Sequence, residues 1–350
     1  MRIGVLGASV SAQTLRHNSK EVVGYVEFLR RHYMADISVT EIRQFTYPGN
    51  RLGDAGLIKL GALLTYRPDI CLFEPLVEDV TRGSEADYGD YLGVYDALIA
   101  NGILPVTLAL PWPPYDSRRK IAFTVERLCA TYDLPLIQMR IPADADTDAM
   151  FADQHTNASG GDFYAANIAH ALRAIGAPAQ RLEEIRARWN VPNSRAIARS
   201  VAMHADEFRT LQLDVTFPAG GLTRFRLLQR QKIGPFSPLY QLVITDRETN
   251  REIRRTQLSA WDPWCHFVRF GYTVLADDYL TEQSIGIEIS TLPSLPDYSQ
   301  SRRIMTNWST DPAELHFKPA GPIWGISSTE FSLSLKDASL RPRSEAVRRG

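Results

Sequence analysis

Hydrophobic and polar positions follow two alternating periodicities in the first half of the chain. Short apolar runs with the length of buried strands alternate with segments whose apolar residues recur at helical spacing. The runs lie at residues 3–6, 37–45, 68–73, 104–110 and 134–139, and the helical segments at 20–34, 57–65, 88–101, 118–132 and 163–175. This alternation predicts a doubly wound parallel β-sheet of the α/β class, with right-handed crossovers. Gly102 and Gly176 are expected to end two of the helices, and a capping-box-like pattern from Ser159 to Asp162 to begin the last one.

The pattern changes in the second half. Residues 178–210 look helical and charged, which is typical of a linker or a covering hairpin. Short alternating segments bounded by turns follow at 211–217, 223–228, 240–245, 253–258, 267–274, 285–290, 314–317 and 331–335. They predict an all-β sandwich of jelly-roll type. We therefore expect domains at 1–177 (α/β) and 211–338 (β-sandwich), a helical linker at 178–210 and a basic tail at 339–350.

Composition argues against several classes of binding partner. A chain of 350 residues is longer than one core usually serves, in agreement with two domains. The net charge of −1 argues against nucleic acid or an anionic membrane as a partner. Cys71, Cys129 and Cys265 form no disulfide or zinc pattern, and no pair of histidines has metal-ligand spacing, so we expect neither metal nor cofactor. Without a signal peptide or an apolar run long enough to span a bilayer, the expected compartment is the cytoplasm.

A serine follows the first predicted strand. The apolar run ends in Gly7-Ala8-Ser9, which puts the Ser9 hydroxyl at the carboxyl end of the strand and the amino end of the next helix. Open α/β sheets bind their ligands at that edge, and the Ser9 amide there can stabilise an oxyanion. Serine is also a good helix N-cap, so position alone leaves nucleophile and cap as alternatives.

An acid and a histidine stand before the last helix of the same half, in Asp153-Gln154-His155. The Asp153 carboxylate can hold one imidazole nitrogen while the other nitrogen accepts the serine proton. The alternative is a surface histidine in a loop that is rich in aspartate. Because the loop is polar and is expected at the same sheet edge as Ser9, we favour the acid–base interpretation.

These motifs resemble those of the SGNH (GDSL-like) hydrolases over about residues 1–176. The resemblance implies a flavodoxin-like fold, with Ser9 as nucleophile, His155 as base and Asp153 as its orienting acid. The family's second block contributes a glycine amide to the oxyanion hole. Residues 48–54 stand at that place, with Gly53 as the first candidate and Gly49 as the second.

The sequence departs from the family pattern at three places. Ala8 replaces the usual aspartate after the first glycine, and the acid–histidine spacing is one residue shorter than usual. The third block normally supplies an asparagine donor, but residues 73–79 contain none. An ionised Glu74 accepts hydrogen bonds and donates none, so Asn50 or another group has to supply that donor, or the oxyanion hole is weaker.

Three further side chains are predicted substrate contacts. Trp112 and Tyr115 follow the fourth strand and Glu74 follows the third, so all three are expected at the edge that carries Ser9. We therefore expect a serine esterase or O-acyltransferase, with acetyl as the acyl group and a small-molecule or polysaccharide substrate of carbohydrate type. A transferase would also need an acyl donor.

Three alternatives are weaker. A dinucleotide-binding turn needs more glycines than Gly4 and Gly7. An α/β-hydrolase elbow needs a glycine where Ser11 stands, and its serine comes after several strands. The third alternative is a carbohydrate-binding protein with little or no turnover. Four tryptophans of the second half favour it, although each single one is better explained as part of the sandwich core or the domain interface: Trp261, Trp264, Trp308 and Trp324.

Overall fold

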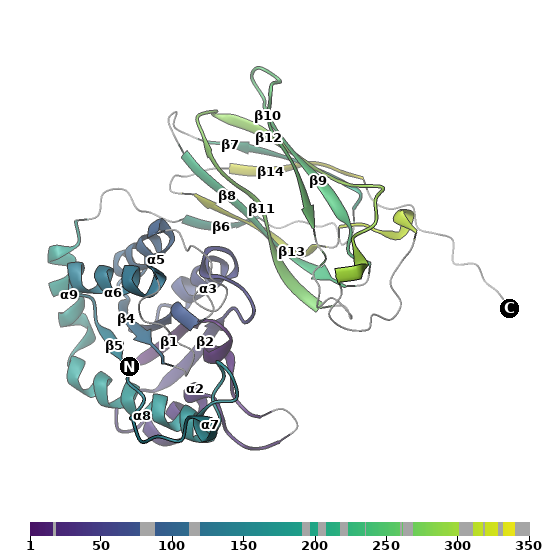
Figure 1. Cartoon of the computed structure of the whole chain (residues 1–350). Coiled ribbons are helices and arrows are strands. Elements are labelled where there is room, and N and C mark those ends of the chain that lie inside the picture. The colour runs from purple at the N-terminus through teal and green to yellow at the C-terminus, as the bar shows by residue number, and fades with distance from the viewer. Residues whose placement is uncertain are drawn as a thin grey trace. The chain divides into compact units, whose positions relative to one another are not determined.

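The computed structural model divides into two compact units, Met1–Ala196 and Ile197–Gly350. The structure describes residues 1–16, 19–77, 88–111, 120–190, 197–201, 208–217, 223–234, 236–259, 261, 269–300, 311–317, 319–327 and 332–339. Figure 1 shows an α/β unit in purple to teal and a β-rich unit in green to yellow.

A five-stranded parallel sheet forms the centre of the first unit. Its strands are β1 (Arg2–Gly7), β2 (Glu41–Thr46), β3 (Ile70–Glu74), β4 (Leu104–Ala109) and β5 (Leu136–Gln138). Their order is β2-β1-β3-β4-β5, and every pair is parallel. This is the flavodoxin-like order, which confirms the predicted fold class. The central strands β3 and β4 are buried along their whole length, as expected for strands covered on both faces.

Helices cover both faces of this sheet (Figure 1). On one face α2 (Tyr25–Phe28), which continues as a π-turn at Leu29–Tyr33, packs against α8 (Ala158–Ile175). On the other lie α3 (Leu57–Tyr66), α5 (Tyr88–Ala100) and α6 (Lys120–Tyr132). Two four-residue helices, α1 (Ser9–Ala12) and α7 (Thr147–Met150), lie in the connections. A second π-turn, Leu52–Gly56, leads into α3.

The last helix of the sheet begins earlier than the capping-box pattern predicts. Asn157 is the N-cap residue of α8, and Ser159 already lies inside the helix. The Ser159 hydroxyl donates to the Ala149 carbonyl at 2.8 Å, and Asp162 accepts from the Tyr33 hydroxyl at 3.0 Å. Both side chains have tertiary partners and so do not cap the helix.

The segment expected to be a helical linker is helical only in part. Helix α9 (Pro178–Arg188) is joined to the α/β unit, since the Arg186 guanidinium donates to the Ile99 carbonyl and the Trp189 indole N–H to the Asp96 carboxylate. Further along, Ile197–Val201 forms strand β6, which pairs with a strand more than a hundred residues later. Local sequence could not reveal that distant partner.

The second unit holds nine strands among its described residues, in two antiparallel sheets. One sheet has the order β10-β9-β12-β7-β14 and the other β11-β8-β13-β6. Besides β6, the strands are β7 (Thr210–Thr216), β8 (Thr223–Ile233), β9 (Leu239–Asp246), β10 (Glu252–Ser259), β11 (Arg269–Leu280), β12 (Ser284–Thr291), β13 (Pro319–Ser327) and β14 (Ser332–Ser339). Apolar side chains of both sheets share one core, so the unit is a β-sandwich.

One predicted strand is absent and a neighbouring one appears instead. In the region expected as a strand at 314–317, Pro312–Glu314 is a 3₁₀ turn, and only Phe317 forms a bridge, to Phe208. The strand that follows, β13, contains two prolines and two glycines, which usually argue against a strand. Its register shifts between Pro319 and Ile323, so the ladder is interrupted where those residues lie.

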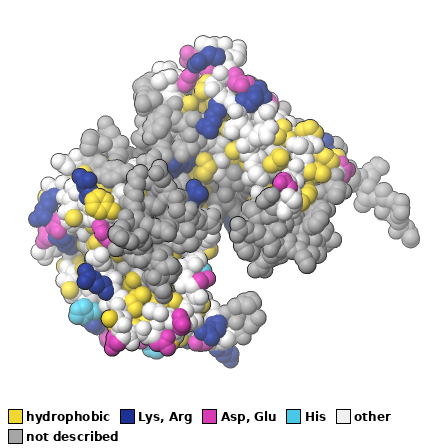
Figure 2. Space-filling model, viewed as in Figure 1, with side chains coloured by type: hydrophobic (Ala, Val, Ile, Leu, Met, Phe, Trp, Pro, Cys, Tyr) yellow, Lys and Arg dark blue, Asp and Glu magenta, His cyan; other side chains and the backbone are white. Residues whose placement is uncertain are grey.

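Charges of both signs are mixed over the surface. On the face shown in Figure 2, basic and acidic side chains of the described residues alternate over both units. Many of them pair, as Arg181 does with Asp133 and Arg255 with Glu252. No helix within the described ranges has both the length and the apolarity to cross a bilayer.

Buried tyrosines predict an alkaline limit to stability. Burial raises the pKa of Tyr25, Tyr95 and Tyr164 above the usual value of 10. The unfolded chain therefore releases these protons near pH 10 while the folded chain keeps them. The free energy of unfolding should hold below pH 10 and fall above it, by about 1.4 kcal/mol per group and pH unit. Urea midpoints between pH 8 and 11 measure this. In the Tyr95→Phe variant the free energy of unfolding should fall less steeply with pH than in wild type. Equal slopes would contradict the raised pKa of Tyr95.

Candidate active site

Ser9 lies where β1 passes into α1. Ala8 is the N-cap residue, and Ser9 is the first residue of the helix, so the helix itself offers no acceptor for the Ser9 amide. The Ser9 Oγ atom is enclosed and has no hydrogen-bond partner among the described residues. Buried polar atoms are nearly always paired, and an unpaired one calls for a functional explanation. A hydroxyl that is enclosed and unpaired at the ligand-binding edge fits a nucleophile better than a cap.

The Asp153–His155 pair forms inside a tight loop between α7 and α8. Phe151 and Thr156 bridge its ends, and the Ala152 amide donates to the His155 carbonyl at 3.0 Å. One oxygen of Asp153 accepts the His155 backbone N–H at 2.7 Å and lies 2.8 Å from the His155 Nδ1 atom. With Nδ1 as donor, Nε2 is the nitrogen that can accept a proton. The imidazole is 34% exposed, so it remains accessible.

Gln13 links this loop to the Ser9 turn. Its side-chain amide donates to the Thr156 carbonyl at 2.7 Å, and its oxygen accepts the Thr156 N–H at 3.1 Å. Gln13 follows Ser9 by four residues, about 6 Å along a helix, and Thr156 adjoins His155, about 3.8 Å between Cα atoms. Ser9 and His155 therefore lie at the same edge of the sheet. No direct hydrogen bond joins them among the described contacts, and such bonds often tighten only when substrate is bound.

Close backbone packing holds the histidine loop in place. A Cβ atom on Gly161, in the first turn of α8, would lie 2.2 Å from the Val23 carbonyl oxygen. The same oxygen accepts the Thr156 hydroxyl at 2.6 Å. Helix α8 and the loop before it thus share one anchor on the segment that leads into α2, and only glycine fits there.

The predicted oxyanion loop follows β2 and is tied to the residue before Ala8. The Tyr47 amide donates to the Gly7 carbonyl at 3.0 Å. The Asn50 N–H donates to the Tyr47 carbonyl at 3.1 Å and Gly49 has a φ of +69°, so residues 47–50 form a tight turn. The Asn50 side chain donates to the Pro48 carbonyl at 2.9 Å. Gly53 lies in the π-turn that leads into α3. The roles of Ser9, Gly49, Asn50 and Gly53 as oxyanion donors remain predictions.

Glu74 ends β3 beside the Ser9 turn, and its side chain is fully buried. Its Oε2 atom accepts the Ala8 N–H at 3.1 Å and the Ser11 hydroxyl at 3.2 Å, and its Oε1 atom accepts the Val77 N–H at 2.9 Å. The structure thus gives Glu74 protein donors from the Ser9 turn and from its own loop, whereas the sequence suggested a substrate contact. The carboxylate acts as an acceptor at the place where the family pattern has a donor.

Several functional residues were not found from sequence, and some predicted ones cannot be located. Gln13, Thr156 and Tyr25 carry no motif, and their contacts join residues far apart in the chain. The predicted substrate residues Trp112 and Tyr115 lie outside the described residues, as do Trp264 and Trp308. Trp261 is half-buried and packs against the sandwich core.

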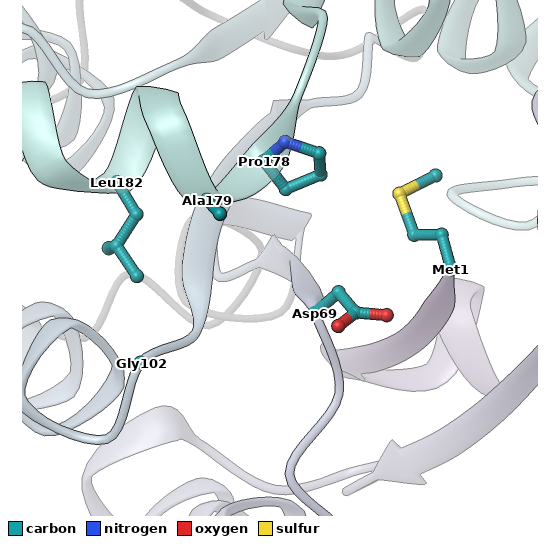
Figure 3. A pocket seen from close by; sticks show the side chains of 6 residues that line it. All are labelled: Met1, Asp69, Gly102, Pro178, Ala179 and Leu182. Atoms are coloured by element: carbon teal, nitrogen blue, oxygen red, sulfur yellow. The ribbon is translucent and has the colours of Figure 1, made fainter.

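A pocket of about 320 Å³ lies at the opposite edge of the sheet (Figure 3). It is lined by Met1, Asp69, Gly102, Pro178, Ala179 and Leu182. Met1, Asp69 and Gly102 precede β1, β3 and β4, so the pocket faces the amino ends of the strands, away from the ligand edge. Its carboxylate, Asp69, accepts the Arg2 amide at 2.6 Å. Over the described residues, no group of three or more metal-ligating side chains is assembled.

The fold and this edge define a class: two-unit proteins with a flavodoxin-like α/β unit, a serine after its first strand, an Asp–His loop before its last helix, and a β-sandwich. No family model matches the sequence, and no curated protein sequence is significantly similar. Among solved structures, a two-domain esterase (CEX) active on acetylated mannans aligns with 92% of this chain and 90% of its own, at 14% identity and a TM-score of 0.59.

A second structure of such a two-domain esterase, co-crystallized with mannopentaose, aligns over the same shares at 13% identity and a TM-score of 0.60. A lipase/acylhydrolase from Enterococcus faecalis aligns with 50% of this chain and 94% of its own, at 20% identity and a TM-score of 0.38. The chain therefore has the fold of a two-domain esterase over both units. The flavodoxin-like sheet that the sequence resemblance implied for the first unit is confirmed by the observed strand order.

The Gly161 contact predicts a measurable loss of stability. Alanine favours a helix over glycine by about 1 kcal/mol. In Gly161→Ala, however, the new methyl group meets the Val23 carbonyl, and we expect a net destabilisation of about 1–3 kcal/mol. Urea unfolding followed by circular dichroism measures it. The control His170→Ala, on the exposed face of the same helix, should change stability by less than about 0.5 kcal/mol. A stabilised Gly161→Ala variant would contradict the close approach.

Proposed function

We propose that this protein is a serine-dependent acyl-ester hydrolase whose triad is Ser9, His155 and Asp153. The observation that carries the proposal is the position of two groups at one sheet edge. An enclosed and unpaired Ser9 hydroxyl lies in a turn that Gln13 and Thr156 join to the Asp153–His155 loop. The fold shared with a two-domain esterase supports the same reaction class.

In the first half of the reaction, Ser9 Oγ attacks the ester carbonyl while His155 Nε2 takes its proton. Asp153, which lies 2.8 Å from Nδ1, stabilises the imidazolium. The tetrahedral intermediate collapses, the alcohol leaves with the proton from His155, and the acyl group remains on Ser9. A water molecule, activated by the same imidazole, then releases the acid and restores the Ser9 hydroxyl.

The oxyanion needs donors on the side away from Glu74. The Ser9 amide is one, because it heads α1 without an intrahelical acceptor. The β2–α3 loop supplies the others, with Gly53 first, then Gly49 and Asn50. The Tyr47–Gly7 bond supports this assignment, since it ties that loop to the residue two before Ser9. Losing one such donor typically costs about 10²–10³ in rate.

We propose an O-acetylated carbohydrate as the substrate. The support is the fold shared with an esterase that is active on acetylated mannans. Trp112 and Tyr115 remain the proposed aromatic contacts. A sugar hydroxyl in place of water would make the same site an O-acyltransferase, for which a separate acyl donor is required. The steps above use only the chain's own residues.

Carbohydrate binding without turnover is the competing proposal, and it has less support. Trp261, one of the tryptophans that suggested it, packs edge-to-face on Tyr298 at 5.8 Å and against the core. A polar hollow lies on the outer face of the five-stranded sheet of the second unit. Arg247, Arg255 and Glu252 are among the residues that line it. Its two arginines already pair with carboxylates, Arg247 with Asp214 and Arg255 with Glu252.

Replacement of the nucleophile should remove activity without unfolding the protein. Ser9→Ala and His155→Ala should each lower p-nitrophenyl acetate hydrolysis by at least about 10³-fold, because neither attack nor proton transfer remains. Ser159→Ala, which removes an exposed serine on α8, is the control and should retain activity. A fluorophosphonate probe should label wild type on Ser9. Unchanged hydrolysis in Ser9→Ala would overturn the enzyme proposal, and glycan binding without any turnover would favour the competing one.

Replacement of Asp153 should lower kcat less than replacement of His155 does, but more than replacement of a nearby acidic residue. In Asp153→Asn the amide no longer stabilises the imidazolium, so kcat should fall by about 10²–10⁴-fold. Asp148→Asn, in the same acidic segment and exposed, is the matched control and should lie within twofold of wild type, which is about the noise of such a comparison. Equal rates for both variants would remove Asp153 from the triad.

A further inference from the structure

Two departures from the family pattern meet in one hydrogen bond. Ala8 stands where an aspartate is usual, and Glu74 stands where a donor-bearing block is usual, 66 residues later. The Ala8 N–H donates to the Glu74 carboxylate at 3.1 Å. The two positions are therefore one structural unit, although the sequence shows them as separate losses.

The Glu74 carboxylate performs the work of a helix cap for α1. In a capping box, the third helical residue accepts the N–H of the N-cap residue through its carboxylate. In α1 the N-cap is Ala8 and the third residue is Ser11, which has no carboxylate. Glu74 supplies that acceptor from β3, and its Oε2 atom also accepts the Ser11 hydroxyl at 3.2 Å.

Ser9 lies between Ala8 and Ser11, the two residues that are hydrogen-bonded to Glu74. Because peptide planes are rigid, fixing the Ala8 N–H and the Ser11 side chain restricts the orientation of the Ser9 Cα–Cβ bond and of its amide. The geometry is tight, since a Cβ atom on Gly7 would lie 2.3 Å from the Ser11 Oγ atom and 3.1 Å from the Glu74 Cβ atom. Glycine at position 7 is what lets β1 pass beside both.

Tyr25 extends the chain of bonds to the helical layer. Its hydroxyl lies 2.8 Å from the Ser11 Oγ atom, and Ser11, Tyr25 and Glu74 are all fully buried. Burial raises the pKa of Tyr25, so its phenol stays protonated and able to donate. In a site shielded from water these bonds are stronger than on the surface, and each unmet partner would be costly.

We propose that Glu74 is a positioning residue for Ser9, acting with Ser11 and Tyr25 through the backbone of α1. The proposal rests on the proposed function and adds to it a role that touches neither substrate nor reacting atoms. Its consequence is that loss of the Glu74 carboxyl group should lower the rate at each folded site while leaving substrate binding nearly unchanged.

The test compares two matched tyrosine variants with Glu74→Gln. Tyr25→Phe removes a buried hydroxyl 2.8 Å from a serine of α1. Tyr95→Phe removes an equally buried hydroxyl that lies 2.8 Å from Thr107 of β4, and serves as the control. Hydrolysis of p-nitrophenyl acetate is normalised to the sites titrated by a fluorophosphonate probe, so that unfolded molecules do not count. Melting temperatures are recorded for each variant.

In Glu74→Gln, kcat per titrated site should fall by about 10–100-fold, since misplacement of about 1 Å has effects of that size. KM should stay within about threefold, the mark of an interaction that matters only in the transition state. Tyr25→Phe should lower kcat per site by about 2–10-fold, the value of one hydrogen bond. Tyr95→Phe should lower the melting temperature and leave kcat per site unchanged.

Each outcome decides one question. If wild type hydrolyses the ester through Ser9 while Glu74→Gln and Tyr25→Phe match it per titrated site, the positioning role is wrong and the proposed function stands. If Glu74→Gln does not fold, the comparison of Tyr25→Phe with Tyr95→Phe tests the positioning role by itself. If wild type shows no turnover that depends on Ser9, the proposed function fails and the positioning role fails with it.

Discussion

The two hydrogen bonds between the Gln13 side chain and the Thr156 backbone are the constraint on which the site depends. They join the turn after the first strand to the loop before the last helix, across 143 positions of sequence. Bonds from the Thr156 hydroxyl to Gln13 and from Arg16 to Asn157 join the same two segments. Thr156 is almost fully buried, and its hydroxyl also reaches Val23, so the link is protected from water and keeps its strength.

The fold was predictable where local pattern decides it. Strands β3 and β4 are buried on both faces, so their sequences are mostly apolar runs, and their alternation with helices predicts a parallel doubly wound sheet. The flavodoxin-like strand order was expected only from the family resemblance, because the alternation by itself does not fix which strands are neighbours. Strand β13 was not predictable, because its prolines and glycines are tolerated only through a ladder with β8 and β6 that the local sequence does not show. The start of α8 was missed for the same reason, since Ser159 bonds to a carbonyl outside the helix.

The candidate site, too, was predictable from sequence only where its contacts are local. Asp153 and His155 are two residues apart, and their pairing is a local property that the motif already contains. The role of Glu74 depends on three donors from two separate segments, and β1 and β3 are neighbours only because the sheet order makes them so. A motif comparison therefore reports Ala8 and Glu74 as two defects, whereas the structure describes one compensated pair.

A carboxylate beside the proposed nucleophile also bears on where the proposed oxyanion would lie. In its ionised form, Glu74 would repel the negative charge that the proposed reaction develops on the substrate oxygen, and such repulsion is strongest in a buried site. The hydrogen bonds that Glu74 accepts from Ala8, Ser11 and Val77 come from the start of α1 and from its own loop. The opposite flank of Ser9, formed by the loop after β2, is then the favourable side for the oxyanion. The carboxylate that we propose as the positioning group for Ser9 is thus also an argument for the proposed donors from Gly49 to Gly53 over any group at the end of β3.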